Sequence, residues 1–320
     1  MRVFVTGSSG FAGSHLVADL LAAGHDVWHL MHAATSHTTL PEHPNSHIIS
    51  GDLLDLDGLK SAVQEAKPDV IYHLAGQAFP GKSWQNVART IALNTGGTAN
   101  LLEAAVEYGR PKVVVVTSAE IYGKIRPNQL PITERSIPKP RHPYGVSKHA
   151  AGQLVKTFAD RYGLPVVEAR PFNHIGPNQA LGFVVPDFAS QLAAICLGLR
   201  EPKMMVGNLS AARDFTDVRD VVRAYQMLAE HGKPGDAYLI CSGSATSISG
   251  ILNMLLEHVD IQVDVEYDPA RMRPSDVPIL YGSFNKIAKD IGWTPQIHLR
   301  DSLADVSAEW REKIAQSSLA

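Results

Sequence analysis

The sequence predicts an α/β protein built on a doubly wound parallel sheet, with a smaller C-terminal substrate domain interleaved with it. A β-branched run from Arg2 to Thr6 leads directly into a glycine-rich turn and then into apolar residues at helical spacing. A nearly continuous valine run from Lys112 to Thr117 has the pattern of a central parallel strand that is buried on both faces. Strand-like and helix-like segments alternate between these two runs, as in a chain of βαβ units.

Bulk composition argues against several classes of function. A chain of 320 residues is long enough for one large α/β domain, or for one domain plus a smaller one. The net charge of −3 gives no electrostatic reason to expect a nucleic-acid or membrane-surface partner. No apolar run approaches the ~20 residues of a membrane helix, and no signal-peptide pattern precedes the first strand. We therefore expect a cytoplasmic protein with no nucleic acid and no membrane among its partners.

Cysteines and histidines are expected to serve packing and surface roles. Cys196 and Cys241 lie in apolar stretches, which favours reduced core residues, with a disulfide as the alternative. The fourteen histidines raise the question of a metal site. Those between His25 and His47 lack zinc-site spacing and fall in a predicted surface loop, so no metal site is expected.

The glycine-rich turn, Gly7-Ser8-Ser9-Gly10-Phe11-Ala12-Gly13, lies at the first strand–helix junction. This context favours a dinucleotide site in a Rossmann-type domain over the alternative, a plain strand-to-helix turn. The glycines let backbone N–H groups approach a pyrophosphate, and the helix N-terminus adds partial positive charge. The predicted cofactor contacts in the turn are Gly7, Ser9, Gly10, Phe11, Ala12 and Gly13.

The next strand, Asp26 to Met31, bears on which dinucleotide binds. It runs into Leu30-Met31-His32-Ala33, which offers neither an acid for a ribose 2′-hydroxyl nor an arginine for a 2′-phosphate. NADPH and NADH therefore both stay open, with NADP favoured. Strands are also predicted at His47–Ser50 and Val70–Leu74, and Asp52 just after the first of these can accept a hydrogen bond from the adenine amino group.

A helix is predicted from Val87 to Tyr108, with an apolar face that forms either core or a subunit contact. The valine run that follows ends at Ser118, with Glu120 just beyond it. Ligands of doubly wound sheets bind at the carboxyl ends of the strands, so Ser118 is expected beside a substrate oxygen.

The stretch Tyr144-Gly145-Val146-Ser147-Lys148 carries the predicted acid–base chemistry. Pro143 is suited to the first position of a helix, in which residues four apart share one face. A phenol has an unperturbed pKa of ~10, and a nearby ammonium favours the phenolate and lowers that pKa. Tyr144 and Lys148 are therefore expected to exchange a proton with a carbonyl or alcohol oxygen, although such pairs also occur by chance.

Taken together, these motifs resemble the extended short-chain dehydrogenase/reductase family, in the branch that acts on nucleotide sugars. The resemblance rests on the glycine turn, Asp52, Gly76, Asn94, Ser118 and the Tyr144/Lys148 pair, in family order. It implies that Ser118 and Tyr144 hydrogen-bond the reacting sugar oxygen, that Tyr144 relays the proton, and that Lys148 holds the nicotinamide ribose. Further cofactor contacts that it implies are Asp52, Leu53, Leu74, Ala75, Gly76, Asn94, Thr117, Tyr144, Lys148, Pro171 and Asn173. A homodimer through the helix after Val87 and the helix bearing Lys148 is also implied.

Motifs of the second half resemble the GDP-mannose 4,6-dehydratases and, more closely, their sister reductases that form GDP-D-rhamnose. They are the segments 172–179, 207–209, 213–218 and 268–274. A GDP-linked sugar is therefore the expected substrate, and a heptose analogue stays an alternative. The predicted substrate contacts are Gln77, Ser118, Glu120, Asn173, Val184, Asn208, Arg213, Arg273 and Asp276. Arg213 and Arg273 are suited to a bidentate grip on a diphosphate, the alternative for each being a solvated surface charge.

Three functions follow from this pattern. The first is reduction of a GDP-4-keto-6-deoxy-mannose, with the proton from Tyr144 and Ser118 stabilising the developing charge. The second is a 4,6-dehydratase or epimerase, in which Glu120 is a catalytic base and the cofactor is regenerated in each cycle. The third is a regulatory protein that binds the cofactor without chemistry, which the intact Tyr144/Lys148 pair disfavours.

The two predicted domains interleave along the chain. Residues 1–170, with about 215–241, form the NAD(P)-binding Rossmann domain. Residues of about 171–214 and 242–320 form the nucleotide-sugar-binding domain, in which a helix between Phe183 and Leu199 covers the sugar pocket.

Overall fold

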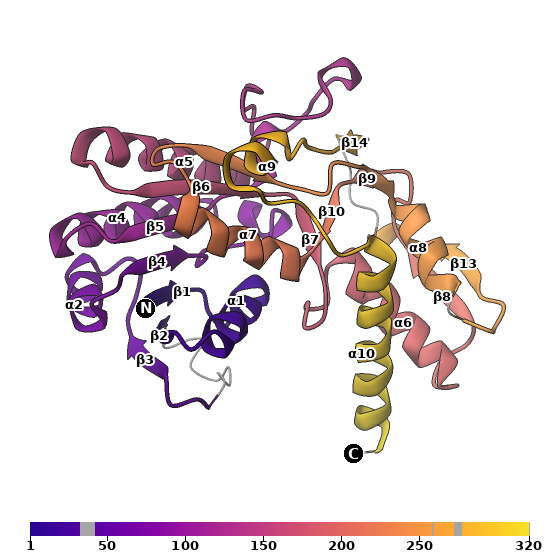
Figure 1. Cartoon of the computed structure of the whole chain (residues 1–320). Coiled ribbons are helices and arrows are strands. Elements are labelled where there is room, and N and C mark those ends of the chain that lie inside the picture. The colour runs from indigo at the N-terminus through magenta and orange to yellow at the C-terminus, as the bar shows by residue number, and fades with distance from the viewer. Residues whose placement is uncertain (33–41, 258, 272–276, 320) are drawn as a thin grey trace.

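The computed structural model describes residues 1–32, 42–257, 259–271 and 277–319. Its largest sheet has seven strands in the order β11-β6-β5-β4-β1-β2-β3, and every pairing is parallel (Figure 1). The strands are β1 (Arg2–Thr6), β2 (Asp26–Met31), β3 (Ser46–Ser50), β4 (Val70–His73), β5 (Lys112–Val116), β6 (Val166–Pro171) and β11 (Ala237–Ile240). The predicted doubly wound fold is confirmed, and each strand predicted in the first half is present to within one residue at either end.

Helices cover both faces of this sheet. One face packs against α1 (Phe11–Ala22), α7 (Val218–His231) and α9 (Asn285–Ile291), and the other against α2 (Leu56–Ala66), α4 (Gly97–Tyr108) and α5 (Pro143–Tyr162). Successive side chains of a strand point to opposite faces. Val3 and Val5 of β1 therefore pack in the hydrophobic cluster on the first face, and Phe4 packs in the cluster on the second face. Each such fully buried side chain stabilises the fold by about 1.5–3 kcal/mol.

The helix predicted from Val87 to Tyr108 is interrupted. It consists of α3 (Val87–Ile91), a π-helical turn (Ala92–Gly96) and α4. A π-turn adds one residue to the helical ladder and often marks a functional site. Here it turns Asn94 inward, where its side chain is buried against the loop after β4.

A second group of elements lies at one end of the sheet, on the right of Figure 1. It contains the helices α6 (Val184–Cys196), α8 (Ile248–Leu256) and α10 (Leu299–Leu319), which share a hydrophobic cluster. Its short strands are β7 (Asn173–Ile175) with β10 (Phe215–Asp217), β8 (Lys203–Val206) with β13 (Asp264–Tyr267), and β9 (Ala212–Arg213) with β12 (Thr246–Ser247) and β14 (Ile279–Leu280). The α6 helix matches the one predicted over the sugar pocket. The division into two domains stays a prediction. Helix α9 was predicted in the sugar-binding domain, but it packs in the hydrophobic cluster of the large sheet.

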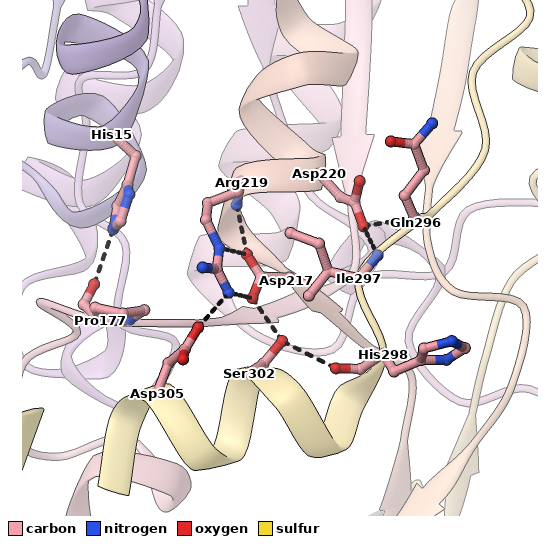
Figure 2. A network of polar contacts seen from close by, with 10 residues as sticks. All are labelled: His15, Pro177, Asp217, Arg219, Asp220, Gln296, Ile297, His298, Ser302 and Asp305. Carbon is pink, nitrogen blue, oxygen red and sulfur yellow. Dashed lines mark hydrogen bonds and ion pairs between the residues drawn. The ribbon is translucent and has the colours of Figure 1, made fainter. Parts of the chain in front are cut away.

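A buried carboxylate ties the two groups of elements together (Figure 2). Asp217 caps α7 by accepting from the Arg219 N–H at 2.8 Å, and it also receives the Arg219 guanidinium at 2.8 and 2.7 Å. Arg219 reaches on to Asp305 of α10 at 2.7 Å, and Ser302 of α10 donates to Asp217 at 2.5 Å. Burial alone would raise the pKa of Asp217, but the bonds from Arg219 and Ser302 outweigh it and lower that pKa. The start of α7 is thereby fastened to α10.

Both cysteines are unpaired, with Cys241 buried and Cys196 partly exposed. Within the described ranges no helix combines the length and apolar character needed to cross a membrane. In the same ranges no group of three or more His, Cys, Asp or Glu side chains is arranged to hold a metal ion.

Candidate active site

The glycine turn after β1 is shaped for close approach of a ligand. Gly7 has a φ of +78°, and a Cβ there would lie 2.6 Å from the Ala75 nitrogen. A Cβ on Gly13 would lie 2.0 Å from the Gly7 oxygen, so neither position accepts a side chain. Gly10 caps α1, and no described side chain accepts from the first-turn N–H groups. A turn of bare backbone donors at a helix N-terminus fits the diphosphate of a dinucleotide.

The loop after β4 is held against α5 by Asn94. Its Oδ1 accepts from the Gln77 N–H at 2.8 Å, and its Nδ2 donates to the Gln77 oxygen at 3.1 Å and to the Ser147 hydroxyl at 2.9 Å. Gly76 has a φ of +150°, and a Cβ on it would lie 2.5 Å from the Asn94 Oδ1 and 3.7 Å from the Lys148 Nζ. The predicted residues Gly76, Asn94 and Lys148 therefore border one space.

Ser118, Tyr144 and Lys148 converge at the carboxyl end of β5. Pro143 opens α5 as predicted, and Tyr144 and Lys148 lie one turn apart on it. Lys148 Nζ donates to the Val116 oxygen at 2.8 Å, and the Ser118 side chain lies close enough to the Tyr144 hydroxyl to influence its pKa. All three predicted side chains are nearly buried, with 7–8% exposure. Their catalytic roles stay predictions, but the geometry brings them together.

The pKa of the phenol differs from the expectation. Burial raises the pKa of Tyr144 to about 12; the Ser118 side chain acts in the opposite direction, and the Glu120 charge raises the pKa further. Burial also lowers the pKa of Lys148 to about 8. The net shift is therefore upward, because burial dominates, whereas the predicted effect of Lys148 on the pKa of Tyr144 stays a prediction. The phenol stays protonated at neutral pH, which is the state that a proton donor needs.

Glu120 lies in the short 3₁₀ helix that follows Ser118, and its side chain is one-third exposed. Its Oε2 accepts from His142 Nε2 at 3.0 Å, while His142 Nδ1 accepts from the Gly145 N–H at 3.0 Å and so caps α5. The Glu120 N–H donates to the Ser118 hydroxyl at 3.1 Å. His142 was not among the predicted residues, although the residue before a proline at the first helical position is the natural N-cap.

The other predicted cofactor residues differ in whether their side chains are available to a ligand. Asp52 accepts from the Leu54 N–H at 3.0 Å and lies 3.5 Å from the His32 Nε2, just beyond β2. Leu53 points into the core, and the Thr117 hydroxyl donates to Glu168 at 2.6 Å, so these two side chains turn away from a ligand. Of the remaining four, Leu74 and Ala75 follow β4, Pro171 ends β6 and Asn173 begins β7.

The predicted substrate residues lie on several separate loops and elements, and two of them are not described by the structure. Gln77 is anchored by donating to the Phe79 oxygen at 2.7 Å, and Val184 begins α6. Asn208 accepts from the N–H and hydroxyl of Ser210, within its own loop. Burial lowers the pKa of Arg213, and the negative charge of Glu120 acts in the opposite direction. The two oppositely charged side chains therefore interact electrostatically. Arg273 and Asp276 lie outside the described residues.

The chain is similar to proteins of known family over nearly its whole length. The family model for GDP-mannose 4,6 dehydratase matches residues 4–306. The chain belongs to this family. The predicted resemblance to the nucleotide-sugar branch of the extended short-chain dehydrogenase/reductases is thereby confirmed.

Two relatives and one solved structure show what the chain is similar to. The GDP-6-deoxy-D-mannose reductase of Pseudomonas aeruginosa is 37% identical over 316 residues, which are 98% of this chain and 99% of the relative. A solved structure of RMD from Pseudomonas aeruginosa complexed with NADPH has a TM-score of 0.86 and 36% identity, covering 98% of this chain and 99% of that one. The GDP-mannose 4,6-dehydratase of Vibrio cholerae is 28% identical over 350 residues, which cover 96% of this chain and 93% of the relative.

Proposed function

We propose that the chain is an oxidoreductase that reduces the C4 ketone of GDP-4-keto-6-deoxy-D-mannose with NADPH and forms GDP-D-rhamnose. The observation that carries this proposal is the convergence of Ser118, protonated Tyr144 and Lys148 beside a glycine turn that fits a dinucleotide. The 37% identity to a GDP-6-deoxy-D-mannose reductase over nearly the whole chain supports the choice of substrate. The NADPH of the RMD complex supports the choice of cofactor.

When bound, NADPH supplies the hydride that reduces C4. Tyr144 then donates its phenolic proton to the oxygen of the former ketone, so that the product leaves as an alcohol. The Ser118 hydroxyl, which lies beside Tyr144, stabilises the negative charge that develops on this oxygen. Lys148 is oriented by its bond to the Val116 oxygen and supplies positive charge next to the phenol.

The alternative is a 4,6-dehydratase or epimerase reaction. A dehydratase needs a carboxylate base for the C5 proton, and Glu120 is the carboxylate next to Ser118. However, Glu120 accepts from His142 and supports the cap of α5, which favours a structural role. Reduction is therefore the better-supported reaction.

A stoichiometry assay separates these reactions. The purified protein is incubated with GDP-4-keto-6-deoxy-mannose and either NADPH or NADH, and the product is identified by NMR. The proposal predicts one reduced cofactor oxidised per sugar, with a higher kcat/KM for NADPH than for NADH. Conversion of the sugar without net oxidation of either cofactor contradicts it and supports an epimerase, and turnover of GDP-mannose without net oxidation of a cofactor would support a dehydratase.

The titration of Lys148 predicts the pH dependence of this reduction. Its ammonium is charged below a pKa of about 8 and neutral above it, whereas Tyr144 stays protonated throughout this range. We expect kcat/KM to be flat from about pH 6 to pH 7 and to fall above about pH 8. The variant Lys148→Arg keeps its charge, so its lower activity should show no such fall. An unchanged alkaline fall in Lys148→Arg would assign it to another group.

We further propose that two copies associate through the face formed by η2 (Gly81–Trp84), α3 and α5. Trp84, Val87 and Val146 on these elements are 64%, 44% and 45% exposed, which is high for large apolar side chains. Sedimentation velocity at micromolar concentration tests this, and a monomer there would contradict it. The proposed location is the cytoplasm, which cell fractionation tests.

A further inference from the structure

A buried polar network lies directly beneath the proposed site. The two oxygens of Glu168 on β6 accept from Arg170, with Nε at 2.9 Å and Nη2 at 2.7 Å. The Thr117 hydroxyl donates to the same carboxyl group at 2.6 Å, and Arg170 Nη1 donates to the Tyr122 hydroxyl at 2.8 Å. Both Glu168 oxygens accept from the guanidinium, and one also accepts from Thr117, which is the pattern of an ionised carboxylate. Glu168 is 2% exposed.

The network meets α5 on the face that carries Tyr144 and Lys148. Gly152 lies one turn after Lys148, and a Cβ on Gly152 would lie 2.4 Å from the Glu168 Oε1. The missing side chain of Gly152 thus makes the space that the carboxylate occupies. On the other side, Thr117 is the neighbour of Val116, whose oxygen accepts from Lys148. The carboxylate is therefore flanked by the two segments that hold Lys148.

The charged and titratable groups around Lys148 come from three elements. His73 on β4 is fully surrounded by protein; burial, with the Lys148 charge, lowers its pKa to about 3. Its imidazole is neutral at working pH and gives Lys148 no counter-charge. On its own helix Lys148 has Tyr144, which is also neutral, and on β6 it has Glu168 and Arg170. Burial lowers the pKa of Lys148, and the charge of Glu168 acts against this.

We propose that Glu168 is a positioning residue for Lys148. Thr117 and Arg170 hold the carboxylate in the space left by Gly152, one turn of α5 away from Lys148. From there its negative charge stabilises the ammonium form of Lys148. Lys148 in turn supplies the positive charge beside Tyr144. Arg170 fixes the position of the carboxylate through its two hydrogen bonds and is itself held by the Tyr122 hydroxyl. The role of Glu168 rests on the proposed function only through Lys148, and it can be measured without substrate or cofactor.

The test is a titration of Lys148 by NMR in the cofactor-free protein labelled with ¹³Cε-lysine. The Lys148 signal is assigned by its loss in Lys148→Met. In Glu168→Gln, which keeps the shape and the acceptor for Thr117, we expect the titration midpoint of Lys148 to fall by about one pH unit. The alkaline fall in kcat/KM should move with it. An unchanged midpoint in Glu168→Gln would overturn the proposal, even if the enzyme still reduced its substrate.

Two further variants separate charge from packing. The double variant Gly152→Glu with Glu168→Ala delivers a carboxylate to the same space from α5 instead of β6. Its midpoint should return toward that of the unchanged protein, and a midpoint as low as in Glu168→Gln would overturn the proposal. The matched control is Asp220→Asn, which removes an equally buried carboxylate from α7. It should lower stability and leave the Lys148 midpoint where it was.

Discussion

Replacing Tyr144 with phenylalanine is expected to lower kcat for reduction by about 10²–10⁴-fold, the usual contribution of a positioned proton donor. The phenol is nearly buried, and it is protonated at neutral pH because burial raises its pKa to about 12. Phenylalanine fills the same volume but has no proton to give. The measurement is kcat and KM with NADPH in excess, together with the binding constant for NADPH.

Tyr225→Phe is the matched control for this prediction. Tyr225 is also fully buried, and its hydroxyl has no hydrogen-bond partner within the described part of the chain. Its loss should leave kcat within a factor of about two and stability almost unchanged, because no hydrogen bond is broken. If Tyr144→Phe retained the full rate, or lost only as much as Tyr225→Phe, Tyr144 would not be the proton donor.

The largest loss of stability is expected for Asp214→Ala. This 1% exposed side chain accepts four hydrogen bonds: from the Ser242 N–H and hydroxyl at 2.7 Å each, from the Gly243 N–H at 3.1 Å and from the Gly282 N–H at 3.2 Å. A buried donor left without an acceptor costs about 1–3 kcal/mol. Because these donors share one acceptor group, we expect a total loss on the order of 4 kcal/mol. Urea unfolding measures it as a lower midpoint.

Asp236→Ala supplies the comparison for this variant. Asp236 is partly exposed and pairs with Lys286 at 2.9 Å, a surface ion pair of the kind that contributes about 0–1 kcal/mol. If both variants unfolded at similar urea concentrations, the hydrogen bonds that Asp214 accepts from Ser242, Gly243 and Gly282 would not contribute the expected stability.

Much of the fold could be predicted because local signals and packing agree in the first half. The alternation of Val3, Phe4 and Val5 and the valine run of β5 belong to strands that are buried on both faces. The π-turn at Asn94 was missed, since a single extra residue in a helical ladder leaves no mark on apolar spacing. Its cause is a tertiary contact, the pairing of Asn94 with Gln77 and Ser147.

The sequence predicted that Ser118, Tyr144 and Lys148 lie close together, but it did not predict the electrostatics around them. Ser118, Tyr144 and Lys148 follow from strand ends and helical spacing, which are local properties. The raised pKa of Tyr144 depends on burial by distant segments, and no spacing in the sequence reports that. The same holds for Glu168, which reads as one acid within a strand until the fold sets it against Gly152 and Arg170.

The most direct test of the central claim follows a labelled hydride. GDP-4-keto-6-deoxy-mannose is reduced with NADPH that carries deuterium at the transferred position of the nicotinamide, and the product is examined by NMR. The account predicts one deuterium at C4 of the sugar and one NADPH oxidised for each product molecule. A product without deuterium at C4, formed with no net oxidation of NADPH, would contradict it.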